Sequence, residues 1–219
     1  MKNVIITGAT GMIGGIVLDM CLENDEIGKV TSIVRRATGK THDKLVEVIH
    51  KDFLDYSSIE SHFDNQDICY FCIGVYTGAV PRDKFREITI DYTKVFAELL
   101  RQKNEKTSFC FLSGQGADTT EKSRVAFAKD KGIAENILKG LNFESLHIFR
   151  PGYIYPVTPR KEPNFTYSLM RSLYKPISAI YPNIGLTSVQ LATGIFVTGL
   201  NGGEMDTYEN MDIRKLTSA

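Results

Sequence analysis

Short apolar, β-branched runs alternate with longer amphipathic segments through most of this chain, and this alternation constrains the fold more than any other feature. Strand-like runs are found at residues 3–7, 29–35, 45–51, 67–73, 107–113 and 144–150. Between them, apolar residues recur at helical spacing, as in Met12, Ile13, Ile16, Val17 and Met20. Because strands that alternate with helices form parallel sheets covered on both faces, the sequence predicts an α/β fold with a doubly wound parallel sheet.

The C-terminal third departs from this alternation. The segment after residue 152 contains three prolines that prevent a continuous helix, Pro156, Pro159 and Pro163. From about Phe165 onward we expect two helices and a final strand near residues 208–213. A chain of 219 residues has the length of one open α/β domain. We therefore predict a single domain over residues 1–219, in which residues 153–219 form a small C-terminal cap and the sheet edge.

Composition argues against nucleic acid and membranes as partners. Lys and Arg (26) balance Asp and Glu (26), so no net positive charge attracts a polyphosphate backbone. Residues 176–203 carry no charge, but Pro182, Gly185 and several polar residues interrupt the apolar run that a membrane span requires. The N-terminal apolar run is too short for a signal peptide. These features predict a cytoplasmic protein.

The cysteines and histidines do not form a metal-binding pattern. Cys69 and Cys72 form a C-x-x-C, but they lie inside a predicted strand, where residues three apart face opposite sides of the sheet. The four histidines show no spacing typical of zinc ligands. We predict reduced cysteines and no metal site.

The segment from Thr7 to Gly14 reads Thr-Gly-Ala-Thr-Gly-Met-Ile-Gly and joins the first predicted strand to the first helix. Glycines let a pyrophosphate approach the main chain, and a helix N-terminus supplies free amides and the positive end of its dipole. A tight turn without a ligand would need only one or two of these glycines. The pattern therefore predicts a dinucleotide-binding turn formed by Gly8, Thr10, Gly11, Met12, Ile13 and Gly14.

The residues after the second and third predicted strands bear on the choice of dinucleotide. Arg35 and Arg36 stand where a carboxylate would accept hydrogen bonds from a ribose 2′-hydroxyl. Guanidinium groups bind a 2′-phosphate instead, which favours NADP(H) over NAD(H); two solvated arginines are the alternative interpretation. Asp52, followed by Phe53, is placed either to accept a hydrogen bond from the adenine amino group or to cap a helix that starts near Tyr56.

Five separate segments carry a resemblance to a known superfamily: residues 7–14, 71–74, 90–92, 112–118 and 150–152. Together they resemble the short-chain dehydrogenase/reductase superfamily, in its atypical branch close to Tat-interacting-protein-like and NmrA-like proteins, over nearly the whole chain. The resemblance implies an NAD(P)-binding Rossmann fold. It also implies that Gly74 lies against the adenosine ribose, Ser113 faces the nicotinamide, and Pro151 and Gly152 border its carboxamide.

In that superfamily, a Tyr-x-x-x-Lys pair on the helix after the serine-bearing strand carries catalysis. By resemblance Lys131 holds the lysine position, where it would also contact the nicotinamide ribose, whereas Phe127 stands in place of the tyrosine. Phenylalanine has no proton to donate, and loss of a general acid costs about 10²- to 10⁴-fold in rate. Another donor such as Tyr76, Tyr153 or Tyr155 could replace it, or Ser113 could relay a proton from water.

Two functions from different classes are compatible with these residues. The first is an NADP(H)-dependent oxidoreductase or epimerase-like enzyme for a small carbonyl or sugar-like substrate, in which Ser113 and Lys131 polarise the reacting oxygen. The second is a non-catalytic redox sensor or regulator, whose bound dinucleotide changes its affinity for a protein partner. The sequence leaves open whether there is turnover and whether the chain forms a homodimer.

Overall fold

The computed structural model describes residues 1–158, 174, 177 and 181–217. Its centre is a seven-stranded, all-parallel sheet with the strand order β3-β2-β1-β4-β5-β6-β9. The six strands expected from the apolar runs are confirmed with boundaries that shift by one or two residues. The sheet strands are β1 (Lys2–Thr7), β2 (Ile27–Val34), β3 (Leu45–Ile49), β4 (Ile68–Phe71), β5 (Ser108–Leu112), β6 (Ser145–Arg150) and β9 (Thr207–Glu209).

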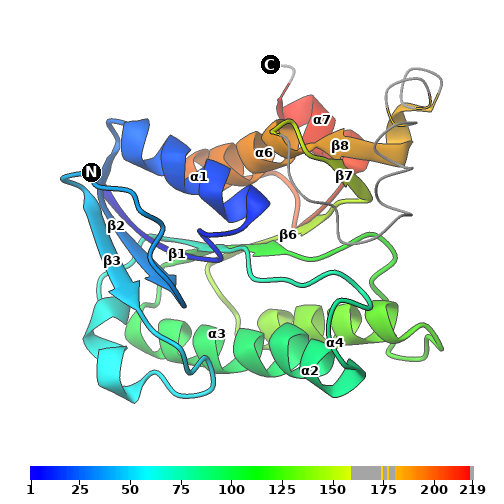
Figure 1. The fold of residues 1–219 in the computed structure, drawn as a ribbon, viewed down its shortest axis with the longest axis horizontal. Helices are drawn as coiled ribbons and strands as arrows, with labels where there is room; N and C mark the ends of the chain where they lie inside the picture. Colours follow the sequence, from blue (N-terminus) through cyan, green and yellow to red (C-terminus); the bar gives the residue numbers. More distant parts are fainter. Residues whose placement is uncertain (159–173, 175–176, 178–180, 218–219) are drawn as a thin grey trace.

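Helices cover both faces of this sheet (Figure 1). One face carries α1 (Met12–Glu23), α6 (Ser188–Asn201) and α7 (Asn210–Leu216), and α6 packs against both α1 and α7. The opposite face carries α2 (Arg82–Arg86), α3 (Tyr92–Lys103) and α4 (Ala126–Gly140). Burial on both sides explains why the central strands are almost uniformly apolar rather than alternating. The predicted doubly wound α/β fold is confirmed.

Aromatic side chains dominate the core beneath α3. Phe96 is fully buried, and its ring lies within 4.9–5.6 Å of the rings of Phe63, Phe71 and Tyr56. Phe63 ends a 3₁₀ helix at Ser57–Phe63 that connects β3 to β4, so the cluster joins this connection to the sheet and to α3. Such ring pairs add attraction beyond the area they bury.

The C-terminal tail differs from the prediction in two places. The final strand ends at Glu209 instead of Ile213, because the chain turns into α7 there and the Asp212 carboxylate accepts a hydrogen bond from the Glu209 amide. The expected loop after Gly152 contains β7 (Tyr153–Tyr155), which pairs with β8 (Gly185–Thr187) in a second, two-stranded sheet. Pro159, Pro163 and Phe165 lie outside the described residues.

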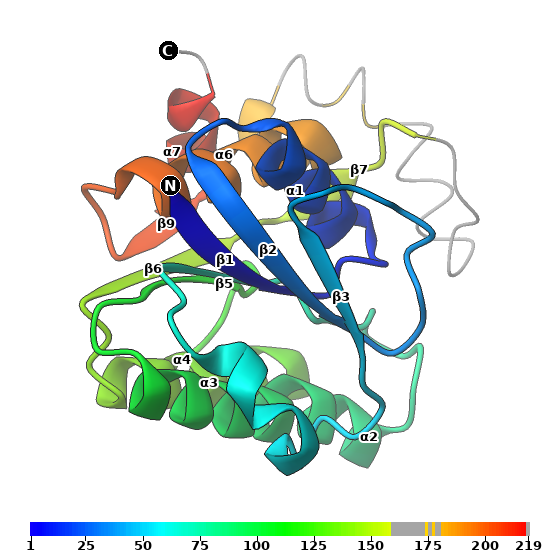
Figure 2. The same ribbon diagram turned by 90° about the vertical axis from the view of Figure 1, so that its left-hand side faces the viewer.

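The connections of the sheet leave a crevice between two neighbouring strands. β1 lies between β2 and β4, and the chain leaves β1 through α1 on one face but leaves β4 through α2 and α3 on the other (Figure 2). Ligands of open α/β sheets bind at such a point, outside the carboxyl ends of the strands. Those ends are Thr7 and Phe71 here, which are paired in register.

The aromatic cluster gives a test of the packing. Truncation of the fully buried Phe96 in the Phe96→Ala variant should lower the free energy of unfolding by about 3–5 kcal/mol, since the remaining rings cannot close the cavity. Urea denaturation measures this difference. Phe96→Leu, which keeps most of the volume, is the control and should cost clearly less. Equal losses in the two variants would contradict a packed cluster around this ring.

Candidate functional site

The turn between β1 and α1 presents free main-chain amides at the carboxyl edge of the sheet. Gly11 is the N-cap of α1, and no side chain caps this helix end. The Gly11 amide donates to the Gly8 carbonyl at 2.8 Å. The first helical amides, those of Met12, Ile13 and Gly14, have no partner within the helix because a helix cannot satisfy its first turn. This helix end therefore offers donors and a positive dipole to an anion.

Two of the glycines are required by the packing of the turn itself. Gly8 has a φ of 76°, and a Cβ there would lie 2.5 Å from the Cys72 carbonyl oxygen on the neighbouring strand end. A Cβ on Gly14 would lie 2.4 Å from the Gly8 carbonyl oxygen. Side chains at either position would push the first turn of α1 away from β1. Gly14 thus acts by holding the helix close, while Gly8 and Gly11 border the open space outside the strands.

Two adjoining cavities extend from this turn along the carboxyl edge. The larger has a volume of about 650 Å³ and the smaller about 230 Å³, and Gly11, Cys72, Gly74 and Val75 line both. The larger cavity collects most of the residues singled out from the sequence: Met12, Ile13, Ser113, Phe127, Lys131, Pro151 and Gly152. Segments from five parts of the chain thus form one site.

The smaller cavity holds the residues expected around an adenosine. Arg35, Arg36 and Phe53 line it together with Gly8 and Thr10. Asp52 does not line either cavity among the described residues; its Oδ1 accepts from the Leu54 amide at 2.9 Å and closes a turn. Nor does Asp52 cap a helix, because the 3₁₀ helix begins at Ser57 with Tyr56 as its N-cap. The helix-cap interpretation of Asp52 is therefore wrong, whereas its contact with an adenine amino group stays a prediction.

Ser113 and Lys131 lie together in the larger cavity. Ser113 follows β5 and is 7% exposed, and Lys131 projects from α4 and is equally buried. The Lys131 ammonium donates to the Leu112 carbonyl at 3.1 Å and lies 5.2 Å from the centre of the Phe111 ring. Phe127, one turn earlier on α4, directs the para carbon of its ring toward Gly114, where a Cβ would meet it at 2.5 Å. The ring occupies the place beside Ser113 without offering a proton.

Burial changes the acidity of Lys131. Loss of water around the ammonium lowers the pKa of Lys131 to about 8, an effect opposed in part by the negative charge of Glu135. Lys131 and Glu135 are four residues apart on α4, so they lie on the same face of this helix. The cavity therefore contains an amine that is partly neutral near pH 8.

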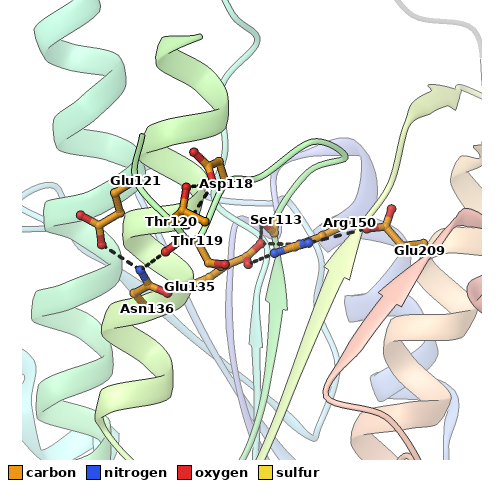
Figure 3. A network of polar contacts seen from close by, with 9 residues as sticks. All are labelled: Ser113, Asp118, Thr119, Thr120, Glu121, Glu135, Asn136, Arg150 and Glu209. Atoms are coloured by element: carbon orange, nitrogen blue, oxygen red, sulfur yellow. Dashed lines mark hydrogen bonds and ion pairs between the residues drawn. The ribbon is translucent and has the colours of Figure 1, made fainter. Parts of the chain in front are cut away.

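A buried ionic network behind Ser113 was not predicted from the sequence (Figure 3). Glu135, fully buried, accepts a hydrogen bond from Ser113 Oγ at 2.5 Å and two from Arg150, one of them from Nε at 2.9 Å. Arg150 also lies 3.7 Å from a carboxylate oxygen of Glu209 on β9. These residues come from α4, β6 and β9. The i, i+4 spacing of Lys131 and Glu135 was the only local signal, since the partner Arg150 comes from a separate strand.

A second buried carboxylate anchors the wall of the cavity. Asp130 is fully buried beside Lys131 and accepts hydrogen bonds from Arg82 and Arg86 at the two ends of α2. Helix α2 follows the segment that contains Val75, Tyr76 and Thr77, all of which line the larger cavity. The ion pairs thus hold α2 against α4.

The residues present fit a nicotinamide dinucleotide. Met12, Ile13 and Gly14 supply amides for a diphosphate at a turn that has no room for side chains at Gly8 and Gly14. Arginines lie at one end of the two adjoining cavities, and Ser113 and Lys131 lie at the other. Tyr76 and Tyr153 also line the larger cavity, whereas Tyr155 is not among its described lining residues.

Comparison with known proteins agrees with this geometry. A family model described as NAD(P)H-binding matches residues 8–162, which is most of the chain. The chain belongs to this NAD(P)H-binding family. Nicotinamide dinucleotide binding follows from that membership, and the resemblance to atypical short-chain dehydrogenases/reductases is confirmed.

Curated relatives of this NAD(P)H-binding protein come from animals and fungi. Protein HTATIP2 of Rattus norvegicus is 29% identical over 156 residues, which cover 70% of this chain and 63% of that protein. The chain thus spans less than two thirds of that relative. Protein FMP52, mitochondrial, of Saccharomyces cerevisiae is 28% identical over 152 residues, 68% of this chain and 64% of that protein. The fmp52 protein of Aspergillus niger is 26% identical over 209 residues, 93% of this chain and 87% of that protein.

Solved structures share the fold. A short chain dehydrogenase family protein from Francisella tularensis matches with a TM-score of 0.71 at 14% identity, over 100% of both chains. The Bordetella bronchiseptica enzyme WbmH in complex with NAD⁺ matches with a TM-score of 0.69 at 18% identity, over 95% of this chain and 74% of that chain. At these identities the likeness establishes the Rossmann architecture alone.

The residues that the structure describes contain neither a membrane-spanning helix nor a cluster of metal ligands. No helix among them has both the length and the apolar composition needed to cross a bilayer. Within the same residues, no three His, Cys, Asp or Glu side chains are grouped as metal ligands would be. All four cysteines are buried and unbridged.

The lowered pKa of Lys131 predicts a pH-dependent stability. The pKa is about 8 in the folded chain and near the ordinary 10.5 when unfolded. Between these values the unfolded chain binds more protons, so the contribution of Lys131 to stability rises with pH, by up to about 3 kcal/mol across this window. Lys131→Met lacks this contribution.

Urea denaturation at a series of pH values from 7.5 to about 10.5 measures the difference between the parent and Lys131→Met. The comparison with the variant is necessary because other groups also titrate. Burial raises the pKa of Cys72 to about 12, so the contribution of this thiol to the free energy of unfolding falls as pH rises. As pH rises, the free energy of unfolding of the parent should increase relative to that of the variant. Parallel curves would show that Lys131 is not desolvated.

Proposed function

We propose that this chain is an NADP(H)-dependent oxidoreductase that acts on a small carbonyl compound or the corresponding alcohol. The observation that carries the proposal is the position of Ser113 and Lys131 in the same cavity as the free amides at the start of α1. The bound coenzyme would supply or accept hydride. Met12 and Ile13 would hold its diphosphate, Lys131 its ribose, and Pro151 and Gly152 would border the nicotinamide carboxamide. Ser113 would contact the reacting oxygen of the substrate.

The preference for the phosphorylated coenzyme rests on Arg35 and Arg36. Both side chains are exposed, and both line the smaller cavity beside Gly8 and Thr10. No acidic side chain is among the described residues that line this cavity, so nothing there would repel a 2′-phosphate. Two guanidinium groups at the end of β2 support NADP(H) over NAD(H).

This preference can be measured by coenzyme fluorescence, which is free of tryptophan emission because the chain has no tryptophan. NADPH should bind more tightly than NADH. The double variant Arg35→Glu, Arg36→Ala should lose about 10- to 100-fold of NADPH affinity, since it removes charge-assisted hydrogen bonds to the phosphate, and should bind NADH nearly as before. Arg124→Ala, an exposed arginine that lines neither cavity, is the matched control. Equal affinity of the parent for the two coenzymes would contradict the role of the arginines.

Phe127 favours a second candidate function. A site that holds the dinucleotide but lacks the phenol suits a redox sensor or regulator, whose bound coenzyme shifts its affinity for a protein partner. The two candidates differ in turnover. We place the oxidoreductase first because Ser113 and Lys131 both keep access to the cavity, whereas regulation alone would not require Ser113 there.

The replacement of the tyrosine predicts the effect of restoring it. In Phe127→Tyr the hydroxyl would extend from the para carbon toward Gly114, next to Ser113. We expect the kcat for reduction of 4-nitrobenzaldehyde by NADPH, followed as absorbance loss of the coenzyme, to rise by about 10-fold or more because a general acid is supplied. Phe127→Leu, which adds no proton donor, should show no rise. If the parent protein already reduces the aldehyde rapidly and Phe127→Tyr leaves its kcat unchanged, the argument from the missing phenol is contradicted.

We also propose a cytoplasmic location and, for the second candidate function, a protein partner. The fungal relatives are named as mitochondrial proteins, whereas the features of this sequence favour the cytoplasm. Fractionation of cells that express a tagged chain distinguishes the two. Crosslinking of the NADP⁺-loaded and NADPH-loaded protein in a cell extract would reveal a protein partner that recognises one redox state.

A further inference from the structure

We propose that Glu135 is a positioning residue that takes up and returns the proton of Ser113 while an oxygen of the substrate reacts in the larger cavity. The proposal rests on the oxidoreductase function and assigns the proton path that Phe127 cannot provide. It concerns a side chain that does not itself touch the substrate. Glu135 is fully buried and is not among the described residues that line the cavity.

The contact between Ser113 and Glu135 is short and directed. Ser113 Oγ donates to Glu135 Oε1 at 2.5 Å, a distance typical of a hydroxyl bound to an ionised carboxylate. Ser113 lines the cavity, whereas Glu135 lies behind it on α4 (Figure 3). The hydrogen bond of Ser113 thus connects Glu135 to the cavity.

The surroundings of Glu135 keep the charges balanced when it takes up a proton. Arg150 on β6 binds both carboxylate oxygens and also lies 3.7 Å from Glu209 on β9. Lys131 on the same face of α4 and Ser113 after β5 also act on Glu135. If Glu135 becomes neutral, Arg150 still has Glu209 as a counter-ion. This arrangement avoids leaving a buried guanidinium without any carboxylate, which would be strongly unfavourable.

Phe127 and Lys131, the other two residues of the Tyr-x-x-x-Lys positions, are less suited to the proton. Phe127 has none to give, and the Lys131 ammonium donates to the Leu112 carbonyl. With its own hydrogen directed at Glu135, Ser113 Oγ presents a lone pair to the cavity. It can accept a hydrogen bond from the hydroxyl of an alcohol.

The proton transfer balances in both directions. In oxidation, the alcohol carbon gives hydride to the oxidised nicotinamide coenzyme and a C=O bond forms. The alcohol O–H breaks as an O–H forms on Ser113, and the original O–H of Ser113 breaks as one forms on Glu135. In reduction, the same proton returns from Glu135 to Ser113 while the Ser113 proton passes to the developing alkoxide. Ser113 is unchanged after either direction, and Glu135 gives its proton to water through Ser113 after oxidation and takes one up the same way before reduction.

The test compares Glu135→Gln and Ser113→Ala with the parent, using 4-nitrobenzaldehyde with NADPH and benzyl alcohol with NADP⁺. Glutamine keeps the shape of the side chain but cannot take up the proton. We expect kcat to fall about 10²-fold in either variant, and the double variant to be no slower than the singles, because both residues serve one path. NADPH affinity measured by fluorescence should stay within about 3-fold of the parent, as Glu135 contacts no coenzyme site.

Two further readouts separate this role from a structural one. Calorimetry should show that benzyl alcohol binds the NADP⁺ complex about 3- to 10-fold more weakly in Ser113→Ala and Glu135→Gln, because one hydrogen bond acceptor is lost or redirected. Phe127→Tyr added to Glu135→Gln should restore turnover through the new phenol.

Outcomes that overturn the proposal are distinct from those that overturn the function. A parent that binds NADPH but turns over neither probe overturns the oxidoreductase function and this proton path with it. A parent that turns over, with kcat unchanged in Glu135→Gln, overturns the proton path alone. If Glu135→Gln does not fold, Ser113→Ala decides, since it keeps the pair of Glu135 with Arg150. An unchanged kcat in Ser113→Ala then overturns the proposal.

Discussion

The parallel pairing of β1 with β4 is the constraint on which the site depends. This pairing sets Thr7 beside Phe71, so the two strands end together and their chains diverge to opposite faces of the sheet. A Cβ on Gly8 would then collide with the Cys72 carbonyl, and a Cβ on Gly14 would collide with the Gly8 carbonyl. The free amides at the start of α1 are fixed by these contacts rather than by a capping side chain. Any change in the separation of β1 and β4 would displace the anion-binding end of the helix.

The two ends of the site are built on different physical principles. At the diphosphate end the donors are main-chain amides, which require small residues and a rigid turn but few particular side chains. At the other end, Ser113, Lys131 and Phe127 line the larger cavity with their side chains, whose properties depend on what lies behind them. Glu135 and Arg150 contribute this second layer from α4 and β6. Under the proposed function, a phenylalanine at position 127 changes the chemistry of this end without disturbing the glycine turn at the other.

The sequence predicted the parts of the fold that depend on local pattern. The buried strands were recognisable because burial on both faces demands continuous apolar runs. The pair formed by β7 and β8 was not, since each has three residues and its partner lies some thirty residues away. The last strand was extended too far because Ile213 continues an apolar pattern, while the hydrogen bond from Glu209 to Asp212 starts a helix instead.

The same distinction explains what was predicted of the site. The residues of the glycine turn are contiguous in sequence, and the structure places Gly8, Gly11, Met12 and Ile13 along the cavities. The short contact of Ser113 with Glu135 joins residues 22 positions apart, and the pair of Glu135 with Arg150 needs α4 and β6 to be packed first. Asp52 shows that a contiguous pattern can also be ambiguous. A carboxylate directly after a strand can accept a hydrogen bond from a nearby backbone amide, as Asp52 does from Leu54.

The buried Asp130 has a mechanical consequence. It secures both ends of α2 to α4 through Arg82 and Arg86, directly before Lys131 in the chain. The segment ahead of α2 forms one wall of the larger cavity, and α4 forms part of the opposite side. Wall and lysine are thereby connected through one buried carboxylate. A bulky ligand that displaces the segment before α2 would therefore also displace α4, the helix that carries the Lys131 ammonium.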